Sequence, residues 1–157
     1  MKPYNLTLAL LKPHVMKHPF AKADIENRII DCGLKILKSK PINFTQETAE
    51  KFYSEHKHRF FFNRLITFMT SGPSYAFVIT GEDAISKWRE LMGPTKVYKT
   101  QFTHPNSIRG IYGISDTRNA THGSDSPESA SKEIIELFPE YLLSDIVKEA
   151  NICCEND

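Results

Sequence analysis

Short apolar runs alternate along this chain with segments of helical spacing, and that alternation constrains the fold more than any other feature. The run Tyr4–Leu11 is apolar and stops at Lys12-Pro13, as a buried strand does. Tyr75–Thr80 is the clearest strand, and Leu34–Leu37 alternates like a half-buried one, with Pro41 marking a sheet edge or strand end. A short strand is also expected around 119–121.

Helical patterns fill the spaces between these strands. Apolar side chains recur at three- and four-residue spacing, and Gly or Pro residues end the segments. The expected helices cover residues 20–32, 45–56, 60–69, 82–92 and 126–138, with a helical turn at 107–110. The resulting order is a βαββαβ frame with extra helices. It predicts an α/β (α+β) fold, a ferredoxin-like sandwich whose four-stranded antiparallel sheet is covered by helices, with a long loop at 93–110.

The chain of 157 residues is expected to form one domain over residues 1–139. Residues 140–157 are expected to be an acidic, weakly ordered tail with at most a short helix near Leu142–Ala150. No apolar run is long enough to span a membrane, and three cysteines form no disulfide framework. A cytoplasmic location is therefore expected, with a mitochondrial one as the alternative.

The charge is divided unevenly along the chain. Residues 1–110 carry 17 Lys and Arg against 9 Asp and Glu, whereas residues 111–157 carry 3 against 10. A basic body suits an anionic ligand. Its lysines are scattered, however, so a nucleic-acid partner is not expected.

One stretch, Arg118–Ser126, combines His122 with asparagine, glycine and small hydroxyl-bearing side chains immediately before a helix. Two interpretations stay open at this point. Asn, Gly, Ser and Asp are ordinary turn residues, and Ser126-Pro127 is an ordinary helix start. Alternatively, the turn presents His122 as a nucleophile.

Phosphate-binding side chains are better represented than phosphate-binding loops. The chain has neither a GxxxxGK[ST] nor a GxGxxG motif, so any bound phosphate must be held by side chains. Lys12, Arg59, Arg89 and Arg109 each lie where two expected elements join, and an arginine fork matches phosphate oxygens. Each of them taken alone is better explained as a surface charge, and only convergence in three dimensions would favour a phosphate site.

Glu133 flanks the apolar face of the last helix, three residues from Ala130 and four from Leu137. A carboxylate there requires a partner or contact with water. As a partner of His122 it would fix the tautomer and leave the other ring nitrogen free to attack. Among Phe60, Phe61 and Phe62, which are mainly core candidates, one exposed ring could stack on a base.

Residues 119–126, Asn-Ala-Thr-His-Gly-Ser-Asp-Ser, resemble the N-x-x-H-G-S-D-S active-site signature of nucleoside diphosphate kinases. Other segments resemble this family in the same order, over roughly residues 4–138. They are Leu10–Pro13, Tyr53 with Arg59 and Phe61, Phe68–Pro73, Arg89 to Thr95, Ile108–Gly110 and Glu128–Ile134. Trp88–Thr95 and Asp116–Asn119 are most similar to the divergent sixth-type members.

The resemblance implies a transferase that moves the γ-phosphate of ATP or another nucleoside triphosphate to a nucleoside diphosphate. His122 would become a phosphohistidine in a ping-pong cycle, oriented by Glu133 and supported by Tyr53 and Ser124. Phe61 would stack on the base with weak selectivity. Mg²⁺ would enter on the nucleotide phosphates without a metal site of the protein's own. The implied nucleotide-binding residues are Lys12, Arg59, Phe61, Arg89, Thr95, Arg109, Asn119 and Gly123, with Lys12 and Asn119 at the ribose 3′-hydroxyl.

Three departures from the family pattern affect these expectations. Phe60 replaces the proline that follows the clamp arginine, and the tail after Pro139 lacks the usual C-terminal segment. The loop from Gly93 to Arg109 is a few residues longer than in housekeeping members, where it builds the trimer faces of hexamers. A dimer or monomer is therefore expected. The alternative function is a weakly active nucleotide-binding scaffold that depends on a partner.

Overall fold

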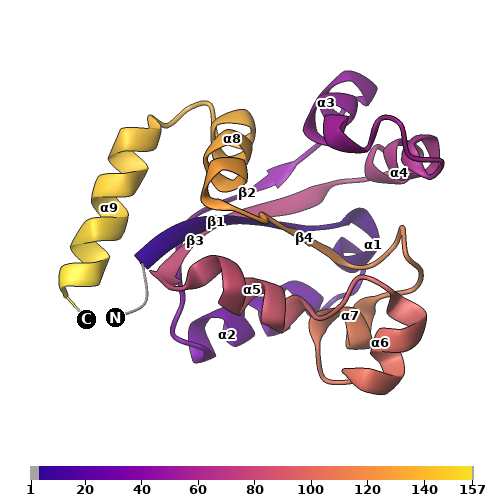
Figure 1. Cartoon of the computed structure of the whole chain (residues 1–157), viewed down its shortest axis with the longest axis horizontal. Coiled ribbons are helices and arrows are strands. Elements are labelled where there is room, and N and C mark those ends of the chain that lie inside the picture. Colours follow the sequence, from indigo (N-terminus) through magenta and orange to yellow (C-terminus); the bar gives the residue numbers. More distant parts are fainter. Residues whose placement is uncertain (1–3, 157) are drawn as a thin grey trace.

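The computed structural model describes residues 4–156 and is built around a four-stranded antiparallel sheet (Figure 1). The strand order is β2-β3-β1-β4, which confirms the predicted ferredoxin-like sandwich. Pro41 lies in the edge strand β2, where a missing backbone donor is tolerated. The strands are β1 (Tyr4–Leu11), β2 (Lys35–Ile42), β3 (Ser74–Glu82) and β4 (Thr121–Gly123).

Helices cover both faces of this sheet (Figure 1). In Figure 1 α3, α8 and α9 lie on one side of the strands, and α2, α5, α6 and α7 lie on the other. The bounds are α1 (Pro13–Met16), α2 (Ala21–Asp31), α3 (Gln46–Phe52), the 3₁₀ helix η1 (Ser54–His56), α4 (Phe62–Met69), α5 (Ala84–Met92), α6 (Val97–Thr103), α7 (Ile108–Tyr112), α8 (Pro127–Leu137) and α9 (Leu143–Glu155).

The two cores follow from the alternation of side chains along the central strand. In β1, Leu8 and Leu10 point into a cluster with residues of α3, α4, α8 and α9. Ala9 and Leu11 point the opposite way, into a cluster with residues of α2, α5 and α7. Because both faces of β1 are covered, its second half, Leu8–Leu11, is a continuous apolar run, and the strand was predicted with its observed bounds.

Hydroxyl caps fix two helix starts where the sequence predicts them. Thr45 accepts from the Thr48 backbone N–H at 3.2 Å, and Ser126 accepts from Ser129 at 3.1 Å. The single helix predicted over 45–56 is wrong, since α3 ends at Phe52 and η1 follows. The one-turn helix α1 was not predicted.

Strand β4 begins two residues later than expected. It spans Thr121–Gly123 and pairs with β1, so that Leu10 lies opposite His122. Ala120 has a φ of 82° and is fully buried. Such a left-handed conformation is incompatible with a strand, so regular pairing starts only after this residue.

The predicted loop at 93–110 contains helices, and the expectation that 95–104 is irregular is wrong. Helix α6 (Val97–Thr103) buries only Val97 and Thr100, too few positions to give a visible period. Thr100 Oγ1 instead lies 2.8 Å from the Pro94 carbonyl and 3.0 Å from the Lys96 carbonyl. Local hydrogen bonds thus anchor a helix that hydrophobic patterning does not reveal.

The C-terminal segment is also more regular than expected. Helix α9 spans thirteen residues, Leu143–Glu155, instead of at most a short helix near 142–150. Its Ile146 and Ala150 are buried against the sheet at a spacing of four residues. Its acidic face meets the basic strand β2, with Lys38 Nζ 3.2 Å from a Glu149 oxygen. These contacts therefore pair part of the acidic C-terminal segment with basic residues of the rest of the chain.

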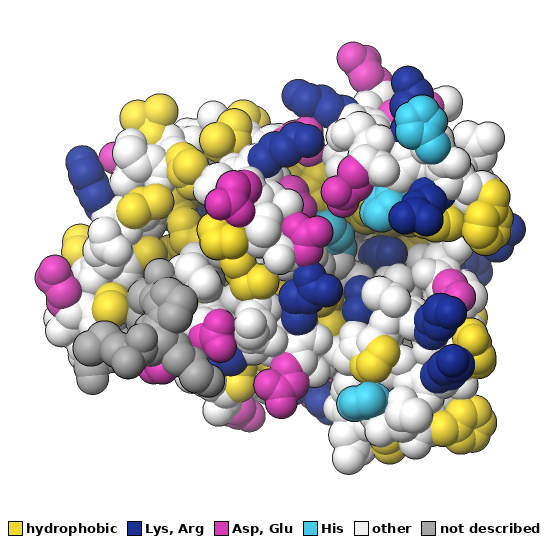
Figure 2. All heavy atoms as spheres, in the orientation of Figure 1, with side chains coloured by type: hydrophobic (Ala, Val, Ile, Leu, Met, Phe, Trp, Pro, Cys, Tyr) yellow, Lys and Arg dark blue, Asp and Glu magenta, His cyan; other side chains and the backbone are white. Residues whose placement is uncertain are grey.

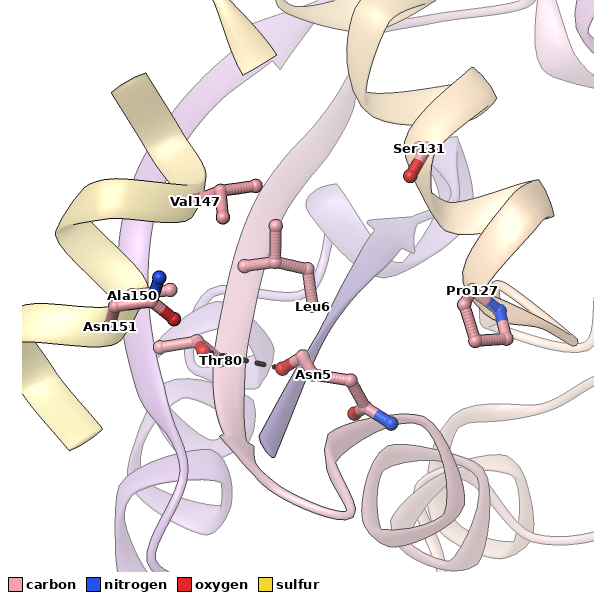
Figure 3. Close-up of a pocket in the computed structure, with 8 residues that line it drawn as sticks. All are labelled: Asn5, Leu6, Thr80, Pro127, Ser131, Val147, Ala150 and Asn151. Atoms are coloured by element: carbon pink, nitrogen blue, oxygen red, sulfur yellow. Dashed lines mark hydrogen bonds between the residues drawn. The ribbon is translucent and has the colours of Figure 1, made fainter. Parts of the chain in front are cut away.

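A small cavity of about 180 Å³ lies where α8 and α9 approach β1 and β3 (Figure 3). Val147 and Ala150 of α9 face Leu6 across it. Within residues 4–156 no helix has both the length and the apolar character needed to cross a membrane. Residues 1–3 and 157, which belong to the predicted segments 1–139 and 140–157, lie outside the described residues, and the boundary between those segments stays a prediction.

Candidate functional site

His122 lies in the middle of β4, and the pairing of that strand decides where its ring points. Directly opposed residues of neighbouring strands share a face, so His122 lies on the same side of the sheet as Leu10. That is the side of α3 and α8. The side chain of His122 is 20% exposed, so it is held by neighbours while one edge remains accessible.

Glu133 of α8 is the closest polar partner of this ring. Its two carboxylate oxygens lie 2.9 and 3.1 Å from His122 Nε2, and its side chain is only 13% exposed. The paired arrangement of Glu133 is therefore observed, and the solvated alternative is not. With Nε2 facing the carboxylate, Nδ1 is the ring nitrogen that makes no hydrogen bond with a described residue.

Ser124 connects Glu133 to the sheet. Its hydroxyl accepts the Leu8 backbone N–H at 3.1 Å and donates to Glu133 Oε1 at 2.9 Å. A hydroxyl has one hydrogen, so this geometry uses it on the carboxylate. The chain of bonds from β1 through Ser124 and Glu133 to His122 fixes the imidazole with respect to the central strand.

Aromatic rings complete the wall around His122. Phe52 and Tyr53, at the end of α3, make edge contacts with the imidazole at centroid distances of 5.1 and 6.0 Å. The hydroxyl of Tyr53 is buried without a partner among the described residues. Burial, followed by the charge of Glu133, raises the pKa of Tyr53, so this phenol stays protonated and available as a donor.

Two buried cations lie beside the segment that leads into His122. Lys12 follows β1, is 5% exposed, and donates to the Thr117 carbonyl at 3.3 Å. Arg109 of α7 is 7% exposed and donates to the carbonyls of Gly93 at 2.7 Å and Thr121 at 3.0 Å. These bonds hold the backbone next to His122 in place. The Nε of Arg109 is buried and has no hydrogen-bond partner among residues 4–156.

The pKa values of two of these cations are lowered by burial and by neighbouring positive charges. Burial, with a contribution from Arg109, lowers the pKa of Lys12 to about 7. Burial, with a contribution from Arg89, lowers the pKa of Arg109 to about 10. Arg109 therefore interacts electrostatically with both Lys12 and Arg89. An anion bound near Arg109 would relieve this repulsion.

Asn119 closes the site beside the strained Ala120. Its Nδ2 donates to the Asp116 carbonyl at 2.9 Å, and its Oδ1 is buried without a described partner. Gly123 lies on the other side of His122. A Cβ there would be 2.6 Å from both Trp88 Cδ1 and Met92 Cε, so only glycine fits.

Other predicted residues are peripheral. Arg59, after η1, and Thr95, between α5 and α6, are exposed and make no side-chain hydrogen bond among the described residues. Phe61 is half-buried at the start of α4, with its ring 5.6 Å from that of His56. In the orientation of Figure 1, Figure 2 shows Lys, Arg and His side chains gathered around a hollow between the α3–α4 side and the α5–α7 side.

Two residues that contact His122 were not among the predicted site residues. Phe52 contacts His122 edge-on, and Trp88 donates its indole N–H to the His122 carbonyl at 3.2 Å. Both residues occupy ordinary apolar positions of their helices, so periodicity alone could not separate them from packing residues. The only available signal was their nearness in sequence to Tyr53 and Arg89.

Comparison with known proteins agrees with this geometry. The family model described as nucleoside diphosphate kinase matches residues 5–142. Nucleoside diphosphate kinase 6 of Xenopus tropicalis is 44% identical, with 92% of this chain and 81% of the relative covered. The Danio rerio protein of the same name is 47% identical, with 90% and 80% covered.

A solved structure supports the same assignment. The nucleoside diphosphate kinase of Aquifex aeolicus superposes with a TM-score of 0.83 at 43% identity, covering 87% of this chain and 96% of that one. The resemblance inferred from the motifs is thereby confirmed, including its likeness to sixth-type members. The chain belongs to the nucleoside diphosphate kinase family of phosphotransferases.

Proposed function

We propose that this chain transfers the γ-phosphate of a nucleoside triphosphate to a nucleoside diphosphate through a phosphohistidine at His122. The observation that carries the proposal is the orientation of the imidazole. Nε2 faces the Glu133 carboxylate at 2.9 and 3.1 Å, which favours a proton on Nε2 and a lone pair on Nδ1. Nδ1 is therefore the nucleophile.

The chemistry balances without a general base. The Nδ1 lone pair forms a bond to the γ-phosphorus, while the bond to the β–γ bridging oxygen breaks and its electrons leave with the nucleoside diphosphate. The ring becomes positively charged, and Glu133 stabilises that charge through Nε2–H. In the second half-reaction, a terminal oxygen of the acceptor diphosphate attacks phosphorus and the lone pair returns to Nδ1.

The cations supply the electrostatic part of catalysis. Arg109 interacts electrostatically with Lys12 and Arg89, and burial lowers the pKa of Lys12 and Arg109, so we assign these three cations to the nucleotide polyphosphate, whose negative charge would stabilise them. Arg59 and Thr95 are exposed at the margin, and we assign them to the outer phosphates.

The nucleoside is assigned to the other end of the hollow. Lys12 Nζ and the unpartnered Asn119 Oδ1 are placed at the ribose 3′-hydroxyl, and Phe61 stacks on the base. Residues 4–156 hold no group of three acidic, His or Cys side chains that could bind a metal. Because the donor set is cationic, Mg²⁺ fits only on the nucleotide phosphates, where it neutralises their charge.

The test is the isolation of the phosphorylated enzyme. Purified protein is incubated with ATP labelled at the γ-phosphate, separated from nucleotide, and then given a nucleoside diphosphate. We expect acid-labile, base-stable label on the protein that passes to the acceptor. The His122→Ala variant should take up no label, whereas His104→Ala, an exposed histidine at the end of α6, should match the wild type.

The competing scaffold function predicts a different outcome. Folded wild-type protein would bind nucleotide but acquire no label, or would acquire it only after a partner protein is added. Either result on the purified chain would overturn the proposal. The molecular mass in solution, measured on the same sample, tests the expected dimer or monomer.

A further inference from the structure

An ion pair on α2 binds both ends of the segment that carries Arg109. Within the pair, Arg28 Nε donates to Asp24 Oδ1 at 3.1 Å. Arg28 Nη1 donates to the Asn106 carbonyl at 2.7 Å, and the Tyr112 hydroxyl donates to Asp24 Oδ2 at 2.6 Å. Asn106 and Tyr112 lie three residues before and three residues after Arg109. We call these three bonds the α2 clasp.

The segment that the α2 clasp holds has little core of its own. Residues 101–106, which lead into α7, are all exposed. Within α7, Ile108 and Arg109 are buried, whereas Ile111 is 44% exposed. Segments with few buried apolar contacts open locally at a low cost in free energy. The bonds from α2 therefore hold in place a segment that packing alone holds weakly.

The placement of this segment decides where the donors of Arg109 lie. Its two terminal nitrogens donate to the carbonyls of Gly93 and Thr121, and its Nε has no partner among the described residues. Because a guanidinium is planar and rigid, a shift of α7 moves all of its donors together. A displacement of about 1 Å in a group that orients a substrate can cost roughly a hundredfold in rate.

The groups of the α2 clasp keep the protonation states that these bonds require. Burial, followed by the bond to Asp24, raises the pKa of Tyr112 to about 12, so its hydroxyl remains a donor. Although burial raises the pKa of Asp24, the bonds from Tyr112 and Arg28 hold it below its ordinary value. Tyr112 is also held from α1 and the turn after it, since His14 Nε2 lies 3.2 Å from its carbonyl oxygen and the His18 ring contacts its ring at 5.2 Å.

We propose that the α2 clasp positions the Arg109 guanidinium for phosphate binding and phosphoryl transfer. Asp24, Arg28 and Tyr112 are then positioning residues, because they act through α7 and not by contact with the substrate. A carboxylate suits this task, since each of its oxygens accepts a bond, whereas an amide has a single acceptor oxygen. The inference rests on the proposed function and extends it to side chains of α2.

The experiment measures single-turnover phosphorylation of the full chain by ATP labelled at the γ-phosphate. The rate reports on the site in folded molecules, and the amplitude reports the fraction of molecules that are folded. Tyr112→Phe, Asp24→Asn and Arg28→Gln should each slow phosphorylation by roughly twofold to tenfold, the loss expected from one hydrogen bond. A purely structural role would lower the amplitude or the Tm and leave the rate unchanged.

Two control variants match these substitutions in chemistry. Glu26→Gln breaks an ion pair of the same helix, in which Lys22 Nζ lies 2.7 Å from Glu26 Oε1 without involving α7. Tyr98→Phe removes a hydroxyl from an exposed ring of α6. Both controls should phosphorylate at the wild-type rate. None of the substituted side chains is fully buried, so all variants are expected to fold, which circular dichroism checks.

Two measurements ask whether the α2 clasp acts through Arg109. Arg109→Lys keeps the charge but loses the fork, so adding Tyr112→Phe to it should slow phosphorylation little further. The second measurement needs no change at the buried Arg109. In equilibrium titrations with inorganic pyrophosphate, which has no nucleoside, Tyr112→Phe should raise the Kd by about the same factor as it raises that of ADP.

The outcomes separate this inference from the proposed function. Wild-type rates in the three clasp variants would overturn it while leaving phosphoryl transfer intact. It would also be overturned by a loss that affects ADP and spares pyrophosphate, or by one that persists in full in folded Arg109→Lys protein. If the wild type forms no phosphoenzyme, the proposed function fails, and the Kd values for pyrophosphate and ADP still decide whether the α2 clasp positions Arg109.

Discussion

Replacing Glu133 with glutamine turns one of its two oxygens into an NH₂ group while keeping the size of the side chain. We predict that this near-isosteric change slows phosphorylation of His122 more than truncation to alanine does. The reason is the hydroxyl of Ser124, which already accepts the Leu8 N–H and donates its only hydrogen to Glu133 Oε1. That hydrogen requires an oxygen at the Oε1 position.

The position left for the amide NH₂ group decides the tautomer of His122. With the amide oxygen held by Ser124, the NH₂ group occupies the Oε2 position, 2.9 Å from His122 Nε2. An N–H that donates to Nε2 forces the ring proton onto Nδ1 and removes the attacking lone pair. Alanine only deletes the partner, so the productive tautomer remains accessible.

The expected loss of rate differs between Glu133→Ala and Glu133→Gln. Loss of a hydrogen bond to a charged group costs about 1.5–3 kcal/mol, so Glu133→Ala should slow phosphorylation roughly tenfold to a hundredfold. In Glu133→Gln, the productive tautomer requires the amide group to turn round, which leaves a buried hydrogen-bond donor without an acceptor and costs about 1–3 kcal/mol. Roughly 1–20% of molecules therefore hold the productive tautomer. Together with the lost charge, the rate should fall about 10²- to 10⁴-fold.

The assay is single-turnover phosphorylation by a nucleoside triphosphate, with folding checked by circular dichroism. The double variant Ser124→Ala/Glu133→Gln supplies the control, because without the hydroxyl the amide can turn round. It should be faster than Glu133→Gln alone, although the Leu8 N–H loses its partner. The reasoning is refuted if glutamine is milder than alanine, or if the double variant recovers nothing.

Three further predictions concern charge and packing. The pKa of Lys12 is lowered from 10.5 to about 7, mainly by burial. Between these pH values the unfolded chain binds a proton that the folded chain has released, so the stability of the free protein rises with pH. Bound nucleotide phosphates raise the pKa of Lys12 again, so nucleotide binding in that pH interval should take up protons. Calorimetry in buffers of different ionisation enthalpy measures this uptake, and the Lys12→Met variant should lose it. Gly123→Ala places a Cβ 2.6 Å from Trp88 Cδ1 and should destabilise the fold by about 1–3 kcal/mol, and an unchanged Tm would contradict this. Tyr112→Phe removes a 2.6 Å bond to Asp24 and should cost about 1 kcal/mol at neutral pH. Although burial raises the pKa of Asp24, hydrogen bonds outweigh it and hold the pKa below its ordinary value, so this stability is present at neutral pH and the difference between Tyr112→Phe and the wild type should shrink as acid protonates the carboxyl in urea titrations.

The parts of the molecule that follow from local chemistry were predictable from the sequence. Residues Leu8–Leu11 of strand β1 are all apolar because both faces of the strand are buried there. Ser126 and Thr45 indicate helix starts through their hydroxyls. The position of Glu133 on the flank of an apolar face correctly indicated a carboxylate in need of a partner. Its pairing with His122 was one of two open alternatives until the geometry decided it.

Other features depend on contacts that no local pattern contains. The start of β4 is set by the left-handed Ala120, a conformation that its sequence neighbourhood does not announce. Helix α9 is held by Ile146, which packs on the sheet, and by an ion pair with a strand more than a hundred residues away. The convergence of Lys12 with Arg109 likewise appears only once β1 and α7 have been packed together.

The site itself shows why these tertiary contacts are arranged at some cost to stability. Lys12 and Arg109 are buried next to each other, and the Tyr53 hydroxyl and Asn119 Oδ1 lack described partners, although such groups are normally paired. Each costs the free protein stability that an apolar side chain would not. A bound polyphosphate supplies the missing charge and acceptors without rearranging the backbone, because β4, Ser124 and Glu133 already hold His122 in place. The cost is therefore incurred during folding, and the reaction proceeds in a site whose dipoles and charges are already oriented.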